Sequence, residues 1–240
     1  MPEFLHPAFW IAVGQIILLD LLLGGDNAVV IALACRDLPP KRRRLGILYG
    51  TLGAIGLRVA LILFALALLA VPYLKATGGV LLLWIGVKLL SPSESEERAV
   101  QTSDKLWSAV RTVILADLVM SMDNVLAIAA AAEVAGAHQV PLVIFGLLVS
   151  IPVIVAGSQL VLRLMDRFPV IITLGAMLLG WVAGQMIWTD AGLQPHLPDA
   201  NAWEYGAAAI GALVVLALGK RRIRRKAAGL AAAALREQGR

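Results

Sequence analysis

Residues 18–34 read LLDLLLGGDNAVVIALA, and residues 115–131 read LADLVMSMDNVLAIAAA. Both stretches contain an aspartate, then five residues, then an Asp-Asn pair that is followed by small and aliphatic residues. The second stretch begins 97 residues after the first, and at the same offset WIGVK at 84–88 aligns with WVAGQ at 181–185. The chain therefore contains an internal repeat, and each copy carries polar residues inside an apolar segment.

The composition predicts a membrane protein. Hydrophobic residues make up 60% of the 240-residue chain, and the mean hydropathy is +0.83. Only 15% of the residues are charged, against about 25% in a typical soluble domain. The apolar residues fall in blocks of roughly 18 to 27, the length that an α-helix needs to cross about 30 Å of hydrocarbon. We therefore expect an all-α, polytopic protein that forms a single membrane domain.

The apolar blocks predict about seven transmembrane helices, at 8–34, 45–70, 74–90, 107–132, 140–162, 169–188 and 204–219. The repeat assigns the first three spans to repeat A, about 8–90, and the next three to repeat B, about 107–188. Helix 7, about 204–219, is followed by a basic tail at 220–240. Because each copy has an odd number of spans, the two copies must cross the membrane in opposite directions. This inverted 3+3 repeat is a common plan of transporters.

The Lys and Arg residues predict the orientation of the chain. Alternating the loops places 18 of the 21 cations on one side, and cations are favoured on the cytoplasmic side. We expect an outside N-terminus and a cytoplasmic C-terminus in the inner membrane of a bacterium. The cluster from Lys220 to Lys226 should contact anionic lipids at about 1 kcal/mol per cation, so the net charge of +5 requires no nucleic acid.

Four aspartates lie deep in the predicted spans: Asp20, Asp26, Asp117 and Asp123. A carboxylate at the centre of a membrane helix costs roughly 2.5–3.5 kcal/mol on insertion scales. Arg58 and Lys88 also lie within spans and are candidate charge partners, and we expect Arg58 to pair with an aspartate while no metal is bound. Four carboxylates against two cations leave two negative charges, which a divalent cation would balance.

The ligand types predict which cation binds. Together with Asn27 and Asn124, the four aspartates offer six hard oxygen ligands, which suit Mg²⁺, Ca²⁺ or Mn²⁺. No histidine lies in a predicted span and the single cysteine, Cys35, lies at a helix end, so zinc and copper are disfavoured. The thioether of Met122, an auxiliary candidate beside the second motif, would favour the softer Mn²⁺ over Mg²⁺.

The spacing places the polar residues of each motif near one another. Residues seven apart share a helix face, so Asp20 and Asn27 face the same way, as do the matching residues of the second copy. Asp26 lies about 100° round the helix from Asn27. The pair Gly24-Gly25 could unwind the helix there and turn Asp26 inward.

We therefore expect a divalent metal ion transporter that works by alternating access, with no organic cofactor. A non-transporting membrane protein that binds metal and aids metal loading or secretion is the alternative. A more distant one is an intramembrane aspartyl protease, but LGGD at 23–26 and AD at 116–117 do not match that signature, so we expect no enzyme. The chain has no nucleotide-binding loop, which favours coupling to protons. Assembly into a homo-oligomer is left open.

The same motifs resemble a known family. GGDNAVVIA at 24–32 and ADLVMSMDNVLA at 116–127 resemble the two signature segments of TerC-like integral membrane proteins, in particular the short branch labelled YjbE-like. The resemblance extends from about Phe9 to Ile187. The family is similar to LysE-type transporters and is associated with manganese efflux. It implies a manganese exporter whose metal-handling residues are Asp20, Asp26, Asn27, Asp117, Asp123 and Asn124.

Overall fold

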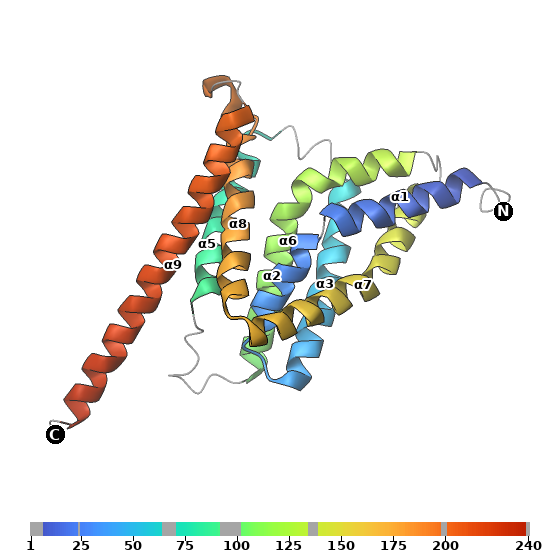
Figure 1. The fold of residues 1–240 in the computed structure, drawn as a ribbon. Helices are drawn as coiled ribbons and strands as arrows, with labels where there is room; N and C mark the ends of the chain where they lie inside the picture. Colours follow the sequence, from blue (N-terminus) through green and yellow to red (C-terminus); the bar gives the residue numbers. More distant parts are fainter. Residues whose placement is uncertain are drawn as a thin grey trace.

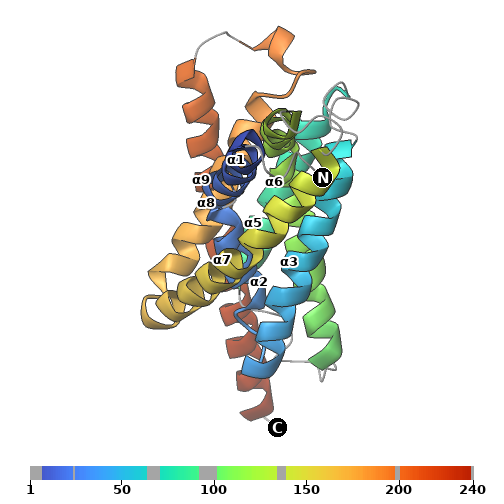
Figure 2. The same ribbon diagram turned by 90° about the vertical axis from the view of Figure 1, so that its right-hand side faces the viewer.

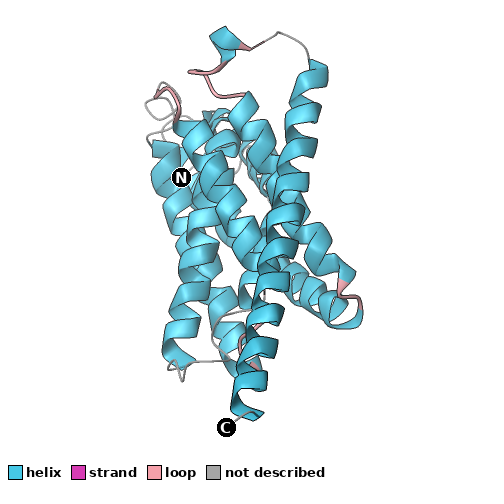
Figure 3. Ribbon diagram, turned by 90° about the vertical axis from the view of Figure 1, so that its left-hand side faces the viewer, coloured by secondary structure: helices cyan, strands magenta, loops and turns pink. Residues whose placement is uncertain are grey.

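The computed structural model describes residues 7–23, 25–63, 71–91, 102–133, 139–197 and 201–238, which are mostly helical and contain no strand (Figure 3). The elements are α1 (Pro7–Leu23), α2 (Gly25–Cys35), α3 (Pro40–Leu63), α5 (Leu74–Leu90), α6 (Thr102–Glu133), α7 (Gln139–Arg167), α8 (Val170–Trp188), the short 3₁₀ helix η4 (Gln194–His196) and α9 (Asn201–Gln238). The prediction of an all-α membrane protein is confirmed in this described part.

Three of the described helices are long and apolar enough to cross a membrane. These segments are Pro40–Ile62 in α3, Val143–Arg167 in α7 and Val170–Trp188 in α8. The apolar segment Asp26–Cys35 in α2 is shorter. Every predicted span overlaps at least one helix, but the number of seven crossings stays a prediction.

The predicted span at 8–34 is divided into two helices. α1 ends at Leu23 and α2 begins at Gly25, and in Figure 1 α1 runs across the direction of α2. Glycine in a helix interior costs about 1 kcal/mol relative to alanine, so two adjacent glycines make this point the weakest of the span. The break lies between Asp20 and Asp26, and these two carboxylates are therefore carried by helices of different direction.

The helices form two groups that share one main core. α5, α8 and α9 pack together, and α1, α2, α3, α6 and α7 form the second group, in which α7 crosses α2 and α3 (Figures 1 and 2). Buried residues such as Ile31, Leu82, Val119 and Leu179 join the two groups. A smaller cluster attaches α1 to α3 and α7, and contains Val13, Ile16, Ile55, Val143 and Leu147.

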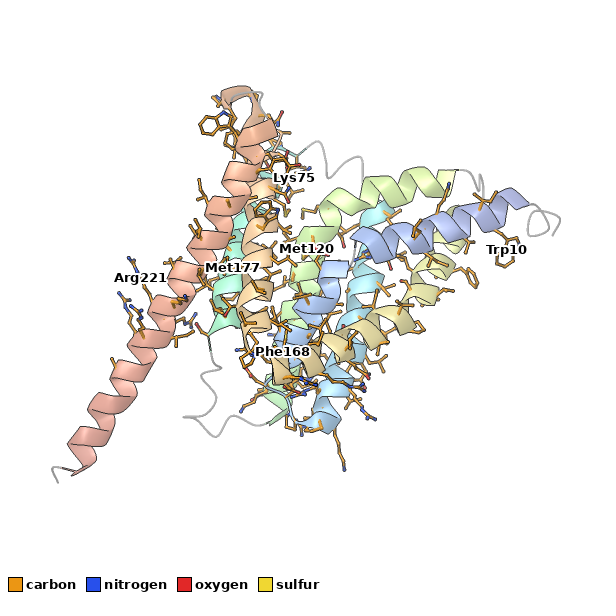
Figure 4. All side chains as sticks on the ribbon, in the orientation of Figure 1. Trp10, Lys75, Met120, Phe168, Met177 and Arg221 are labelled. Carbon is orange, nitrogen blue, oxygen red and sulfur yellow. The ribbon has the colours of Figure 1, made fainter. Side chains whose placement is uncertain are left out.

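The basic connections lie at one end of the molecule. The α2–α3 and α7–α8 connections and the C-terminus of α9 share this end, and residues 71–73 and 189–197 lie at the other (Figure 1). Phe168 and Lys75 mark the two ends in Figure 4. α9 continues to Gln238, well past its predicted end at 219, because the tail is rich in Ala, Leu and Arg, which are strong helix formers.

α8 and α9 pack through small residues with their backbones in contact. Gly180 and Gly184 of α8 face Ala207 and Gly211 of α9. A Cβ atom on Gly211 would lie 2.1 Å from the carbonyl oxygen of Gly180, and one on Gly184 would lie 2.2 Å from that of Ala207. Small residues one turn apart allow membrane helices to approach this closely.

A clamp around Asp190 ties the loop after α8 to the start of α5. The side chain is buried, and its Oδ1 accepts hydrogen bonds from the backbone N–H groups of Tyr73 (3.0 Å) and Gly192 (2.8 Å). Its Oδ2 accepts one from the N–H of Ala76 at 3.0 Å. Burial by itself would raise the pKa of Asp190, but the backbone N–H donors outweigh it and the pKa lies below its usual value.

The α8–α9 contact predicts that Gly211→Val destabilises the protein by about 1–3 kcal/mol, because the new side chain meets backbone atoms that cannot rotate away. Gly206→Val on the same helix is the matched control, since a Cβ atom there has nothing within 4 Å. Thermal unfolding in detergent, followed by tryptophan fluorescence, measures both variants. Equal losses in the two variants would contradict the close packing.

Asp190→Asn should lower the unfolding free energy by about 2 kcal/mol at pH 7, because hydrogen bonds to a charged acceptor are the stronger ones. A carboxylate with a depressed folded pKa stabilises the protein above its unfolded pKa and loses that effect as the pH falls through the folded value. The difference between wild type and variant should therefore shrink below about pH 4. Unfolding measured from pH 7 to pH 3 checks this, and a difference that does not change with pH would contradict the role of the charge.

Candidate functional site

A buried ionic cluster lies where α1, α3 and α6 meet. Arg58 of α3 is 2% exposed and lies between Asp20 of α1 and Asp117 of α6, which are 1% and 5% exposed. Its Nη1 donates a hydrogen bond to Oδ1 of Asp20, and its Nη2 donates to Oδ1 of Asp117. One guanidinium therefore bridges the first aspartate of each repeat copy.

Two buried serines extend this cluster. Nε of Arg58 donates to Oγ of Ser121 at 2.9 Å, and the Ser121 hydroxyl donates to Oδ2 of Asp117 at 3.1 Å. The hydroxyl of Ser150 in α7 has two acceptors, Oδ2 of Asp20 and, at 2.8 Å, the backbone oxygen of Leu147 in its own helix. The sequence pattern does not predict either role. The only available signal is a hydroxyl in an otherwise apolar span, and most such hydroxyls bond to the backbone of their own helix, as Ser158 does to Ile154.

Asp26 and Asn27 of α2 add to the cluster one amide group that donates a hydrogen bond and two side-chain oxygens that accept none from the described residues. Nδ2 of Asn27 donates to Oδ1 of Asp117 at 2.8 Å, which orients the amide within the cluster. Oδ1 of Asn27 and Oδ1 of Asp26 are buried and have no hydrogen-bond partner among the described residues. A buried acceptor without a donor is costly in an apolar medium, and both atoms are suitable ligands for a hard cation.

The structure thus connects Asp20, Asn27 and Asp117 through hydrogen bonds, and it places Asp26 next to Asn27. Asp123 and Asn124 lie in α6, but their side chains are outside the described part of the structure. Among the described side chains, no three or more from His, Cys, Asp and Glu form a group that could hold a metal ion. Arg58, rather than a third carboxylate, lies between the two paired aspartates.

The remaining candidates are placed differently. Lys88 of α5 contacts its own helix, where its Nζ lies over the ring of Trp84, 5.3 Å from the ring centroid. Met122 is partly buried and follows Ser121 in the sequence of α6. Of the two predicted charge partners, the structure therefore brings Arg58 to the aspartates.

The chain is similar to known membrane proteins over most of its length. The sequence pattern of the integral membrane protein TerC family matches residues 5–227. The chain is 44% identical to the uncharacterised membrane protein YjbE of Bacillus subtilis (strain 168) over 172 residues, which cover 72% of this chain and 77% of the relative.

Two further relatives are more distant. The uncharacterised membrane protein YceF of Bacillus subtilis (strain 168) is 30% identical over 189 residues, 75% of this chain and 72% of the relative. The UPF0053 inner membrane protein YgdQ of Escherichia coli (strain K12) is 28% identical over 137 residues, 50% of this chain and 58% of the relative. No solved structure matches the chain.

Proposed function

The chain belongs to the integral membrane protein TerC family, and on this premise we propose that it transports a divalent metal ion, with manganese as the substrate. The charge of the buried cluster carries the proposal. Among the described side chains, the buried Asp20 and Asp117 and the half-buried Asp26 offer three carboxylates against the guanidinium of Arg58. Uncompensated charge is costly inside a membrane protein, and a divalent cation would balance the two excess negative charges.

The available ligand atoms favour a hard cation. The carboxylates of the cluster and the amide oxygen of Asn27 are oxygen ligands, which suit Mn²⁺, Mg²⁺ and Ca²⁺. Met122 follows the cluster on α6, and its softer sulfur would favour manganese over magnesium. Mg²⁺ and Ca²⁺ are therefore the competitors against which selectivity for manganese is to be measured.

The packing of the helices supports two inverted copies. α3 packs along α6 as α7 packs along α1 and α2, and α2 contacts α8 as α6 contacts α5. Exchanging the two copies leaves this pattern of neighbours unchanged, as expected if a two-fold axis relates them. Asp20 and Asp117 come from different copies, so the site lies at their interface, where inverted-repeat transporters bind substrate. We propose that the two copies rock about this site.

We propose that the protein exports the metal, as the family resemblance implies. In the proposed orientation the basic connections and the C-terminus lie in the bacterial cytoplasm and the N-terminus lies outside. Arg221, in the middle of α9, projects away from the other helices (Figure 4), and we propose that the basic cluster around it contacts anionic lipids.

Replacing the site aspartates should stop transport without preventing insertion. We expect a loss of about 10- to 100-fold in the initial rate of Mn²⁺ movement into sealed vesicles for each Asp→Asn change, because each change removes one ligand charge at constant size. The four variants are Asp20→Asn, Asp26→Asn, Asp117→Asn and Asp123→Asn. Asp166→Asn at an exposed position of α7 is the control.

The same vesicles separate the alternatives. Four well-inserted variants that move manganese at the wild-type rate would show that the proposed site is wrong. A wild-type protein that binds manganese but does not move it would be the non-transporting metal-binding protein instead.

We further propose that protons drive export. Moving a doubly charged ion outward against about 100 mV costs roughly 4.6 kcal/mol, and two protons moving inward for each ion would cancel this electrical cost. Vesicles loaded with a pH-sensitive dye should report a pH change during uphill Mn²⁺ movement, and a protonophore should abolish that movement. Uphill movement without a pH change and without sensitivity to the protonophore would exclude this coupling.

A further inference from the structure

We infer that Arg58 and the transported cation compete for the same carboxylate oxygens, so that Arg58 is a built-in counter-ion that must release both aspartates before the cation is fully bound. The inference rests on the proposed function and specifies how the affinity of that site is set. It follows from the hydrogen bonds that Arg58 makes, from its burial and from the position of the two unpaired oxygens.

Protein donors hold all four oxygens of the paired carboxylates. Arg58 donates to Oδ1 of both Asp20 and Asp117, and Ser121 donates to Oδ2 of Asp117. The hydroxyl of Ser150, which also has the Leu147 carbonyl oxygen as an acceptor, donates to Oδ2 of Asp20. The amide of Asn27 shares Oδ1 of Asp117. A divalent cation needs these oxygens as ligands. The cation also repels the guanidinium strongly at close range in a buried site. The cation and the guanidinium therefore cannot both lie between the carboxylates of Asp20 and Asp117.

Arg58 cannot leave this region as a free ion would. Its Nε, Nη1 and Nη2 are all engaged, and the side chain is 2% exposed. Arg58 lies in α3 between Ile55 and Leu61, and these two buried side chains hold that part of the helix in the hydrophobic core. Arginine also keeps its charge at any physiological pH. The competitor is therefore permanently present and permanently charged.

The two unpaired oxygens indicate where the cation first binds. Oδ1 of Asp26 and Oδ1 of Asn27 are the buried acceptors of the cluster without a hydrogen-bond partner in the described part. The other end of the Asn27 amide contacts Asp117. Because the same amide donates to Asp117, we infer that a cation bound at these α2 oxygens meets the Asp117 carboxylate, and displaces Nη2 of Arg58 from it, before it reaches Asp20.

A purely structural role for Arg58 makes the opposite prediction. If Arg58 only positions the aspartates, its removal separates them and weakens metal binding. If Arg58 competes with the cation, its removal strengthens binding, because a site that is only fractionally available has a raised apparent Kd. The sign of the change in Kd therefore distinguishes the two roles.

The test is calorimetric titration of the purified full chain with Mn²⁺. We expect Arg58→Gln to lower the Kd about tenfold or more relative to wild type, while turnover in vesicles falls because the cation is no longer displaced. Arg58→Lys, which keeps the charge but lacks the planar fork, should lower the Kd by less. Arg111→Gln, at an exposed position of α6, is the control for charge removal and should leave the Kd unchanged.

A second measurement identifies the competing group itself. Millimolar guanidinium should raise the Mn²⁺ Kd of Arg58→Ala back toward the wild-type value and should leave that of wild type unchanged, an effect that a structural role does not produce. An unchanged or higher Kd in Arg58→Gln overturns the competition. If Arg58→Gln does not fold, as judged by size-exclusion chromatography, an unchanged or higher Kd in Arg58→Lys overturns it. A wild-type protein that binds no divalent cation would instead refute the proposed function.

Discussion

The bridge from Arg58 to Asp20 and Asp117 is the constraint on which the centre of this molecule depends. A buried ion pair is stable only when it is complete, since removing one partner leaves a charge that the interior cannot solvate. The bridge joins α3 to α1 and α6, and the donors from α2 and α7 join it as well. Five helices from both copies of the repeat therefore meet at one cation.

Much of this arrangement could be predicted from the sequence, because the patterns that indicate it are short stretches of neighbouring residues. Apolar blocks predict helices, and a glycine pair inside such a block predicts the break that separates α1 from α2. Two aspartates at the same position of a repeat predict a shared site. Each of these features can be recognised within a short window of residues, without knowledge of how the helices pack.

The choice of partners could not be predicted, because it depends on which helix faces which. Arg58 and Lys88 are equivalent as sequence signals, yet the first reaches two aspartates and the second stacks on Trp84. Ser121 and Ser150 differ from Ser158 only in what lies opposite them. The full length of α9 could not be predicted from the apolar pattern either, because charged residues end an apolar block without ending the helix.

The length of α9 has a mechanical consequence. A helix of 38 residues is about 57 Å long, nearly twice the thickness of the hydrocarbon layer. The first half of α9 packs closely on α8, with backbone contacts at Gly180 and Gly211. A tilt of α8 is therefore carried along α9 to the half that projects beyond the other helices. A fluorescent or spin label near the tip of α9 would therefore report a tilt of α8 as a displacement of the projecting half.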